Sequence, residues 1–137
     1  MFARLLLPLV LLLGNSILLA ACEPREQFLR LAAQDYRSVP TDIRVLADRP
    51  IRLLIVNEGR ERHEFTSSLL ANAEVQMLAD PPLTLTRNTG TVSIDPGRSV
   101  EIRVQAPAGT YLFHCRVRGH AGMRGTMIVQ PRVVEAT

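Results

Sequence analysis

One short segment near the C-terminal end constrains the fold and the chemistry of this chain most strongly. It holds three metal-binding side-chain types within nine residues, Cys115, His120 and Met123. The apolar run Tyr111–Cys115 precedes it and the β-branched run Thr126–Val129 closes it, which predicts a loop held between two strands. A thiolate, an imidazole and a thioether together favour copper, because sulfur ligands suit Cu(I) and an imidazole suits both oxidation states.

Each of these side chains also has an ordinary interpretation. A buried cysteine is often a small core residue, and a methionine often fills a gap in the core. Met127 competes with Met123 for the role of thioether ligand, but its place inside the closing strand is more typical of packing. His114 is adjacent to Cys115, and consecutive strand residues point to opposite faces, so its side chain is expected to miss the ion.

A copper site with two imidazoles, one thiolate and a weak axial methionine requires a second histidine. The chain has three histidines in all. Besides His120 and His114, the remaining one is His63, which lies 52 residues before Cys115. Spacing alone assigns it no role, and a surface histidine between charged neighbours is the alternative.

Several motifs together resemble the cupredoxins, the family of plastocyanin and azurin. The residues from Gly109 to Val129 resemble that family's copper loop. Upstream, Val56–Gly59 followed by His63–Phe65 is similar to the strand that carries the first histidine ligand. Asp95–Gly97 followed by Ser99–Ile102 is similar to the turn and strand before the copper loop. Each motif alone is weak, whereas their order along the chain is specific.

The resemblance runs from about Arg30 to Gln130 and implies both a fold and a cofactor. The implied fold is all-β, a Greek-key β-sandwich of about seven or eight strands. The implied cofactor is one type 1 copper ion, with ligands at His63, Cys115, His120 and Met123. Only two residues separate the second histidine from the methionine, fewer than is common in the family. A bond from Met123 and an open fourth position are therefore both compatible with the sequence.

Alternation and apolar runs predict where the strands lie. The expected strands are 28–36, 43–47, 51–56, 83–86, 92–94, 99–104, 111–115 and 126–129. Residues 51–56 form an apolar run interrupted only by Arg52, which is typical of a central strand. The segments 92–94 and 99–104 are expected to pair as a hairpin across the turn at 95–97, and 69–77 to contain a helical turn.

The first 21 residues have the composition of a targeting segment. Arg4 provides a positive start, Leu5–Leu13 is apolar apart from one proline, and small residues precede Cys22. Leu19–Cys22 resembles a bacterial lipobox, which predicts a lipoprotein signal peptide over residues 1–21 and lipidation at Cys22. A transmembrane anchor is the alternative, although the segment is slightly short and interrupted for a span of about 20 apolar residues.

The same interpretation predicts how the rest of the chain is divided and where the protein is located. Residues 22–27 are expected to form a lipidated tether and residues 28–137 one domain. The protein is expected to be anchored to the membrane on the extracytoplasmic side of a bacterial cell envelope. Lipidation of Cys22 leaves Cys115 as a lone thiol in an oxidising compartment, which metal ligation explains.

The function implied by the resemblance is one-electron transfer at the copper site, without enzymatic activity. A copper chaperone, buffer or sensor on the same fold is one alternative, and a copper-free interaction module is another. Without residues 1–21 the chain has 15 basic and 13 acidic residues, a net charge of +2, which does not suggest binding to nucleic acid. The resemblance also implies an exposed docking patch formed by residues 120–123. Three arginines would surround this patch and favour redox partners with acidic surfaces: Arg116, Arg118 and Arg124.

Overall fold

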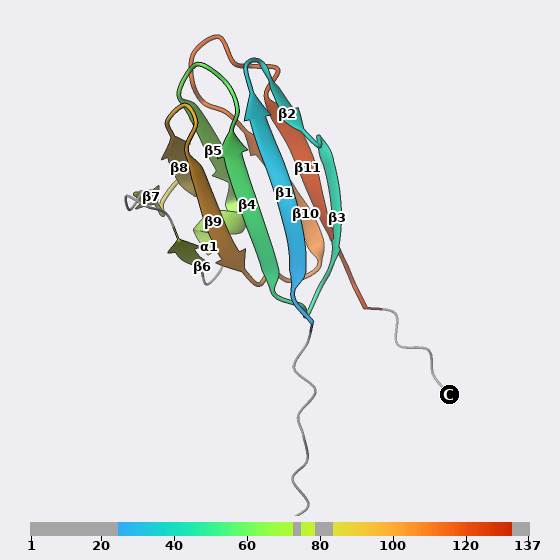
Figure 1. Cartoon of the computed structure of the whole chain (residues 1–137). Helices are drawn as coiled ribbons and strands as arrows, with labels where there is room; N and C mark the ends of the chain where they lie inside the picture. The colour runs from blue at the N-terminus through green and yellow to red at the C-terminus, as the bar shows by residue number, and fades with distance from the viewer. Residues whose placement is uncertain (1–24, 73–74, 79–83, 133–137) are drawn as a thin grey trace, which may run out of the picture.

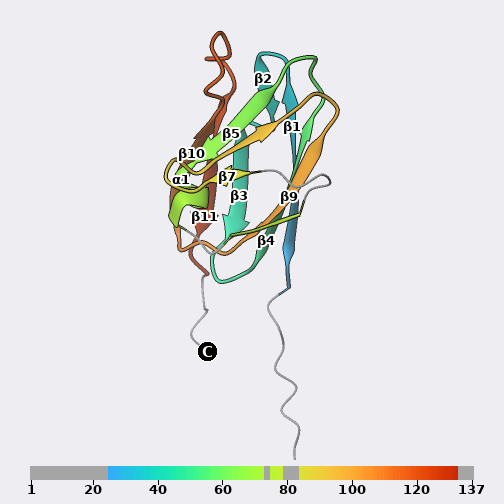
Figure 2. The ribbon, with the colours of Figure 1, turned by 90° about the vertical axis from the view of Figure 1, so that its left-hand side faces the viewer.

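The computed structural model describes residues 25–72, 75–78 and 84–132, which form two β-sheets packed face to face (Figures 1 and 2). The first sheet has the strand order β2 (Arg37–Val39), β1 (Gln27–Gln34), β4 (Ile51–Asn57), β9 (Ser99–Val104) and β6 (Val75–Leu78). The second has the order β3 (Asp42–Leu46), β11 (Arg124–Gln130), β10 (Gly109–His114), β5 (His63–Ser67), β8 (Thr91–Ile94) and β7 (Leu85–Thr86). The short helix α1 (Ser68–Asn72) follows β5.

The core lies between the sheets and follows the alternation of the strands. In β4, the alternate side chains of Ile51, Leu53 and Ile55 are fully buried. Opposite them, Phe65 on β5 and Phe113 on β10 stack with ring centroids 5.5 Å apart. The chain lacks tryptophan, so aliphatic side chains from both sheets make up most of the remaining core.

The all-β Greek-key sandwich predicted from the sequence is confirmed. β1 pairs with β4 and β3 pairs with β11 in parallel, whereas the other pairs are antiparallel. β4 is the middle strand of its sheet, as its apolar run indicated. The described residues contain eleven strands rather than seven or eight. The short edge strands β2 and β6 were not expected, and β5 was indicated only by the resemblance of residues 63–65 to a family strand.

The expected hairpin between residues 92–94 and 99–104 is wrong. β8 belongs to the second sheet, where it pairs with β5 and β7, and β9 belongs to the first sheet, where it pairs with β4 and β6. The turn at Asp95–Gly97 therefore carries the chain from one sheet to the other. Alternation shows which face of a strand is buried, but it does not identify the neighbouring strand.

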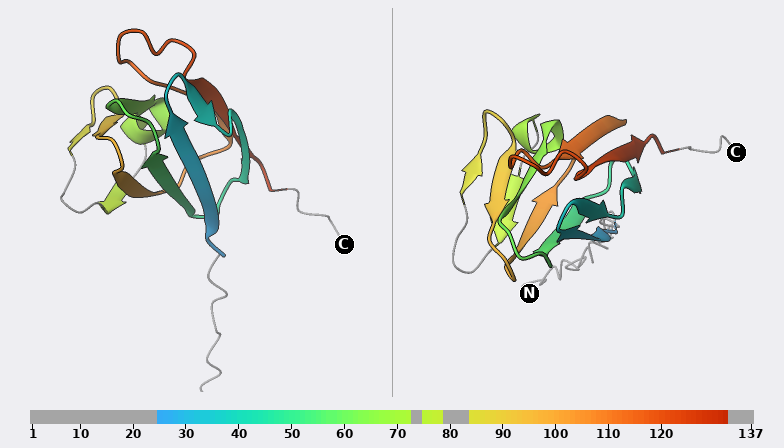
Figure 3. Two further views of the ribbon diagram at one scale, coloured as in Figure 1. Left: turned by 45° about the horizontal axis from the view of Figure 1, so that its top comes forward. Right: turned by 90° about the horizontal axis from the view of Figure 1, so that it is seen from above.

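Three connections meet at one end of the sandwich: the β1–β2 turn, the β4–β5 loop and the β10–β11 loop (Figure 1). Viewed from above in Figure 3, the β10–β11 loop crosses this end of the molecule. The start of β1 and the end of β11 lie at the opposite end (Figure 1). The fold thus brings three segments that are distant in sequence to one end of the molecule.

The predicted signal peptide at residues 1–21, the lipidation site Cys22 and the first part of the tether lie outside the described residues. Within the described part, no helix has the length and apolar character needed to span a bilayer.

Candidate metal centre

The β10–β11 loop and the start of β5 together place four predicted ligands at this end of the sandwich. His63 is the first residue of β5, and Cys115 follows the last residue of β10. His120 and Met123 lie in the loop that leads to β11. All four side chains are buried, and both imidazoles are at most 2% exposed.

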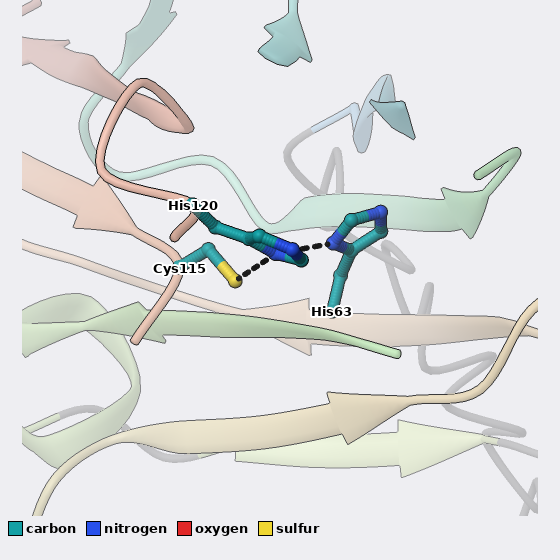
Figure 4. Close-up of side chains that lie close together, drawn as sticks. All are labelled: His63, Cys115 and His120. Atoms are coloured by element: carbon teal, nitrogen blue, oxygen red, sulfur yellow. Dashed lines mark hydrogen bonds between the residues drawn. The ribbon is translucent and has the colours of Figure 1, made fainter. Parts of the chain in front are cut away.

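Three of these side chains converge (Figure 4). The Nδ1 atoms of His63 and His120 are 3.1 Å apart, and Cys115 Sγ is 3.6 Å from His120 Nδ1. One nitrogen from each ring and the sulfur all lie within 4.8 Å of one another. Among the described residues, this is the one group of three or more histidine, cysteine or acidic side chains arranged to hold a metal ion.

Backbone hydrogen bonds fold the β10–β11 loop around its ligands. The N–H of Cys115 donates to the carbonyl of Met123 over 2.9 Å, and the N–H of Met123 donates to the carbonyl of His120 over 2.8 Å. Gly119 adopts a φ of 89°, a conformation that glycine adopts without steric cost. The loop is therefore closed by its own backbone, which fixes the spacing between its ligand residues.

The cysteine sulfur is also held from the β5 side. The backbone N–H of Glu64 donates to Cys115 Sγ over 3.3 Å. Because Glu64 follows His63 directly, this bond links the thiol to the strand that carries the distant histidine. Among the described residues, Cys115 is a free cysteine.

Asn57 organises the β4–β5 loop, and the sequence analysis did not identify this role. Its buried side-chain amide donates to the carbonyls of Glu61 and Ile94, each over 2.8 Å, and accepts the N–H of Gly59. The amide therefore fixes the path of the loop that leads to His63. An Asn-x-Gly turn was visible in the sequence, but its long-range partner was not.

Two carboxylates face the outer ring nitrogens of the histidines. Glu61 Oε2 lies 2.8 Å from His120 Nε2, and Asp35 Oδ1 lies 3.3 Å from His63 Nε2. The first contact is a hydrogen bond, whereas the second is within ion-pair distance but lacks hydrogen-bond alignment. Neither acidic residue stands in a motif with a histidine, so no sequence signal indicated these contacts.

The two-residue β1–β2 turn touches both imidazoles. Asp35 faces His63, and the Tyr36 ring packs edge-on against His120 with centroids 5.6 Å apart. Tyr36 adopts a φ of 69°, which is uncommon for a bulky residue. The turn therefore covers the outer side of the candidate metal centre.

The pKa shifts of His63 and Asp35 favour a neutral imidazole beside a charged carboxylate. Burial lowers the pKa of His63 below its ordinary value; the proximity of His120 acts in the same direction, and Asp35 acts against it. A hydrogen bond from the backbone N–H of Arg60 lowers the pKa of the Asp35 carboxyl. At neutral pH His63 is therefore neutral and Asp35 is a carboxylate.

These contacts show that the donor set fits a metal ion. A carboxylate oxygen lies 2.8 Å from Nε2 of His120 and 3.3 Å from Nε2 of His63, and the two Nδ1 atoms face each other across 3.1 Å. With a proton on each Nε2, both Nδ1 atoms would present lone pairs to each other. Such lone pairs repel one another unless a cation or proton lies between them. Two imidazoles and a thiol, with a buried methionine nearby, are the donor set of a type 1 copper ion.

The sequence analysis also considered Met123, Met127 and His114, and these three residues lie in different surroundings. Met123 lies in a buried cluster with Cys115 and borders the same small cavity as His63, whereas Met127 belongs to the main core. His114 is exposed and is not part of the converging group, as expected.

The predicted exposed docking patch at residues 120–123 is wrong in part. Ala121 and Gly122 are exposed, but His120 and Met123 are buried. Glu61 and the Tyr36 ring contact His120, and they account for its burial. An exposed imidazole edge is therefore not available to a partner.

Comparisons with known proteins agree with the fold. A family model described as "Cupredoxin-like domain" matches residues 5–129. No curated protein sequence matches the chain.

Among solved structures, auracyanin B has a TM-score of 0.57 and 23% identity over 79% of this chain and 91% of its own. Auracyanin A, described as a "blue" copper protein from Chloroflexus aurantiacus, has a TM-score of 0.55 and 19% identity over 77% of this chain and 100% of its own. A multicopper oxidase from Campylobacter jejuni has a TM-score of 0.59 and 13% identity, over 79% of this chain but 30% of its own. At these identities, the structures show a shared fold.

Proposed function

Because the chain belongs to the cupredoxin-like domain family, we propose that it is a one-electron carrier with a single type 1 copper ion. The observation that carries the proposal is the buried convergence of His63, Cys115 and His120, whose donor atoms lie within 4.8 Å of one another. Bound copper supplies the chemistry by alternating between Cu(II) and Cu(I). Met123 would be the fourth residue to hold the ion, because it is buried beside Cys115.

The protein's own contribution is a site that changes little between the two charge states. Its ligands lie on a β-strand and on a loop closed by backbone hydrogen bonds. The N–H of Glu64 donates to the Cys115 sulfur, which stabilises the thiolate form. Burial of both imidazoles keeps water away from the centre, and exclusion of water limits rearrangement during electron transfer.

A carrier role agrees better with the described residues than an enzymatic one. They provide one cluster of potential ligands. A multicopper centre would require further histidines, and the whole chain has only three. A copper chaperone, buffer or sensor remains the competing function, because the same ligands could bind and release the ion.

A groove beside Cys115 is the proposed docking surface for redox partners. It is lined by the exposed Leu112 and by Ala121, Cys115 and Arg124 among others, and its lining is mostly apolar. Because Glu61 and Tyr36 contact His120, we propose that a partner approaches through this groove, which Cys115 itself lines. The exposed Arg124 at its margin favours a partner with an acidic surface.

Attachment through Cys22 to a bacterial envelope membrane is also part of the proposal. The start of β1 lies at the end of the sandwich opposite the metal centre (Figure 1). A lipid at Cys22 would therefore hold the metal centre away from the membrane, where a partner could reach it. Mass spectrometry of the protein from a bacterial host tests this through the mass of two acyl chains.

The experiment that separates a carrier from a copper-delivery protein is metal exchange. The Cu(I) protein is mixed with a chromophoric Cu(I) chelator, and release is followed over time. A carrier is expected to keep its copper for hours and to cycle repeatedly between oxidised and reduced spectra. Release within seconds, with no reversible cycling, would support delivery instead.

A further inference from the structure

Both carboxylates at the candidate metal centre contact a ligand ring from outside. We infer that Asp35 and Glu61 are positioning residues that fix the Nε2–H tautomer of both histidines and bias the site toward Cu(II). The inference rests on the proposed copper site and deepens it. It assigns control of the reduction potential to two side chains that are not themselves ligands.

Of the two carboxylate–histidine contacts, the one between Glu61 and His120 has the better hydrogen-bond geometry. Glu61 Oε2 lies 2.8 Å from a ring nitrogen of a side chain that is 2% exposed. A carboxylate only accepts hydrogen bonds, so the proton must be on Nε2 of His120. The lone pair then lies on Nδ1, which is the atom that faces Cys115 and His63.

Asp35 is held against His63 by three features of the fold. Both of its carboxylate oxygens accept the backbone N–H of Arg60, over 3.0 and 3.1 Å. Gly59 provides the space, because a Cβ there would lie 2.2 Å from Asp35 Oδ1 and 2.6 Å from His63 Nε2. The tight β1–β2 turn brings Asp35 to this point. His63 Nε2 is buried and has no well-aligned hydrogen bond in the described structure, and Asp35 Oδ1, at 3.3 Å, is the acceptor that we assign to its proton.

The consequence for copper follows from charge. A carboxylate hydrogen-bonded to a ligand imidazole makes the ring a better donor and adds negative charge near the ion. Both effects stabilise Cu(II) more than Cu(I), because the attraction grows with the charge of the ion. The pair Asp35 and Glu61 is therefore expected to lower the reduction potential of the site.

The first test measures the reduction potentials of the copper-loaded wild type and of the Glu61→Gln, Asp35→Asn and Glu58→Gln variants. The last is the matched control: Glu58 lies in the same loop region, but its carboxylate bonds Arg30 and Gln34 rather than a histidine. Glu61→Gln and Asp35→Asn are each expected to weaken Cu(II) binding by about 10–100-fold and Cu(I) binding less. Each tenfold change in the ratio of the two affinities raises the potential by about 59 mV.

The second test reads the tautomers without any redox chemistry. In the Zn(II) form of the wild type, nitrogen-15 NMR is expected to show Nε2–H on both rings, with slowly exchanging protons. Glu61→Ala is expected to lose the slow exchange at His120 only. Asp35→Ala, which removes the carboxylate and leaves Gly59 unchanged, is expected to lose it at His63 only.

The inference is overturned if Glu58→Gln shifts the potential as much as Glu61→Gln and Asp35→Asn do, or if neither of the latter moves it. It is also overturned if the carboxylate variants leave the slow exchange of both Nε2 protons in the Zn(II) form unchanged. Failure of the proposed function looks different, because the wild type would then form no copper–thiolate absorption at all.

Discussion

His63 Nδ1 and His120 Nδ1 lie 3.1 Å apart, although the two residues are 57 positions apart in the sequence. Each ring directs its other nitrogen at a carboxylate, so the two inner nitrogens face each other with Cys115 beside them. The site is therefore arranged for a cation before one is bound.

Asn57→Ala should destabilise the metal-free protein by about 1–3 kcal/mol, because it leaves the buried carbonyl of Ile94 without its donor and frees the β4–β5 loop. Chemical denaturation of the metal-free protein measures the change. Asn88→Ala is the control, since Asn88 is exposed in a turn. Equal, small effects of the two substitutions would contradict the role assigned to Asn57.

Met123→Leu and Met127→Leu should separate an axial ligand from a core residue. Both exchanges nearly conserve side-chain volume, so each should cost less than about 1.5 kcal/mol in the metal-free protein. Only Met123→Leu is expected to change the visible spectrum and raise the potential, because it removes a weak donor to Cu(II). A change confined to Met127→Leu would transfer the axial role to Met127.

Much of this organisation could be predicted from the residues, for reasons that are local. Alternation and apolar runs mark β1, β4, β10 and β11, and the spacing of Cys115 and His120 marks the loop. The carboxylates at positions 35 and 61 could not be predicted in this way, because their contacts depend on how the β1–β2 turn packs against the β4–β5 loop. The burial of His120 has the same origin, since Tyr36 comes from a distant turn.

Reversal of charge at Arg124 should slow electron transfer to a small anionic oxidant. Arg124 is exposed at the proposed docking groove, so Arg124→Glu replaces attraction by repulsion there. Stopped-flow oxidation of the Cu(I) protein by hexacyanoferrate(III) is expected to be severalfold slower at low salt, and the difference should shrink as salt rises.

The control for this experiment is Arg132→Glu. Arg132 is exposed two residues beyond β11, and β11 ends at the end of the sandwich opposite the β10–β11 loop (Figure 1). Arg132→Glu changes the net charge as much as Arg124→Glu does, but it should leave the rate of oxidation nearly unchanged. Identical rates in the two variants would argue against docking at the groove.

Glu58 should contribute to stability in a pH-dependent way. Hydrogen bonds from Arg30 and then Gln34 lower the pKa of the Glu58 carboxyl below its ordinary value of 4.5. A carboxyl whose pKa is lower in the folded state stabilises the fold above the unfolded value and loses this contribution as the pH falls through the folded value.

Thermal unfolding of the metal-free wild type and of Glu58→Gln, measured from neutral to acidic pH, tests this contribution of Glu58 to stability. The wild type should have the higher midpoint above about pH 4.5, and the difference should shrink on acidification. The effect should be modest, because both Arg30 and Glu58 are partly exposed to solvent. A difference that grows toward low pH would contradict the assigned direction.

The most direct test of the copper site is the visible absorption spectrum of residues 23–137 after addition of one equivalent of Cu(II). The wild type should develop an intense blue or green band that disappears on reduction and returns on oxidation. Cys115→Ser should lack the band yet retain its β-sheet circular dichroism, because the substitution removes the thiolate while the surrounding core remains. An intense band that persists in Cys115→Ser, or a wild type that remains colourless with copper bound, would contradict a type 1 centre built on Cys115.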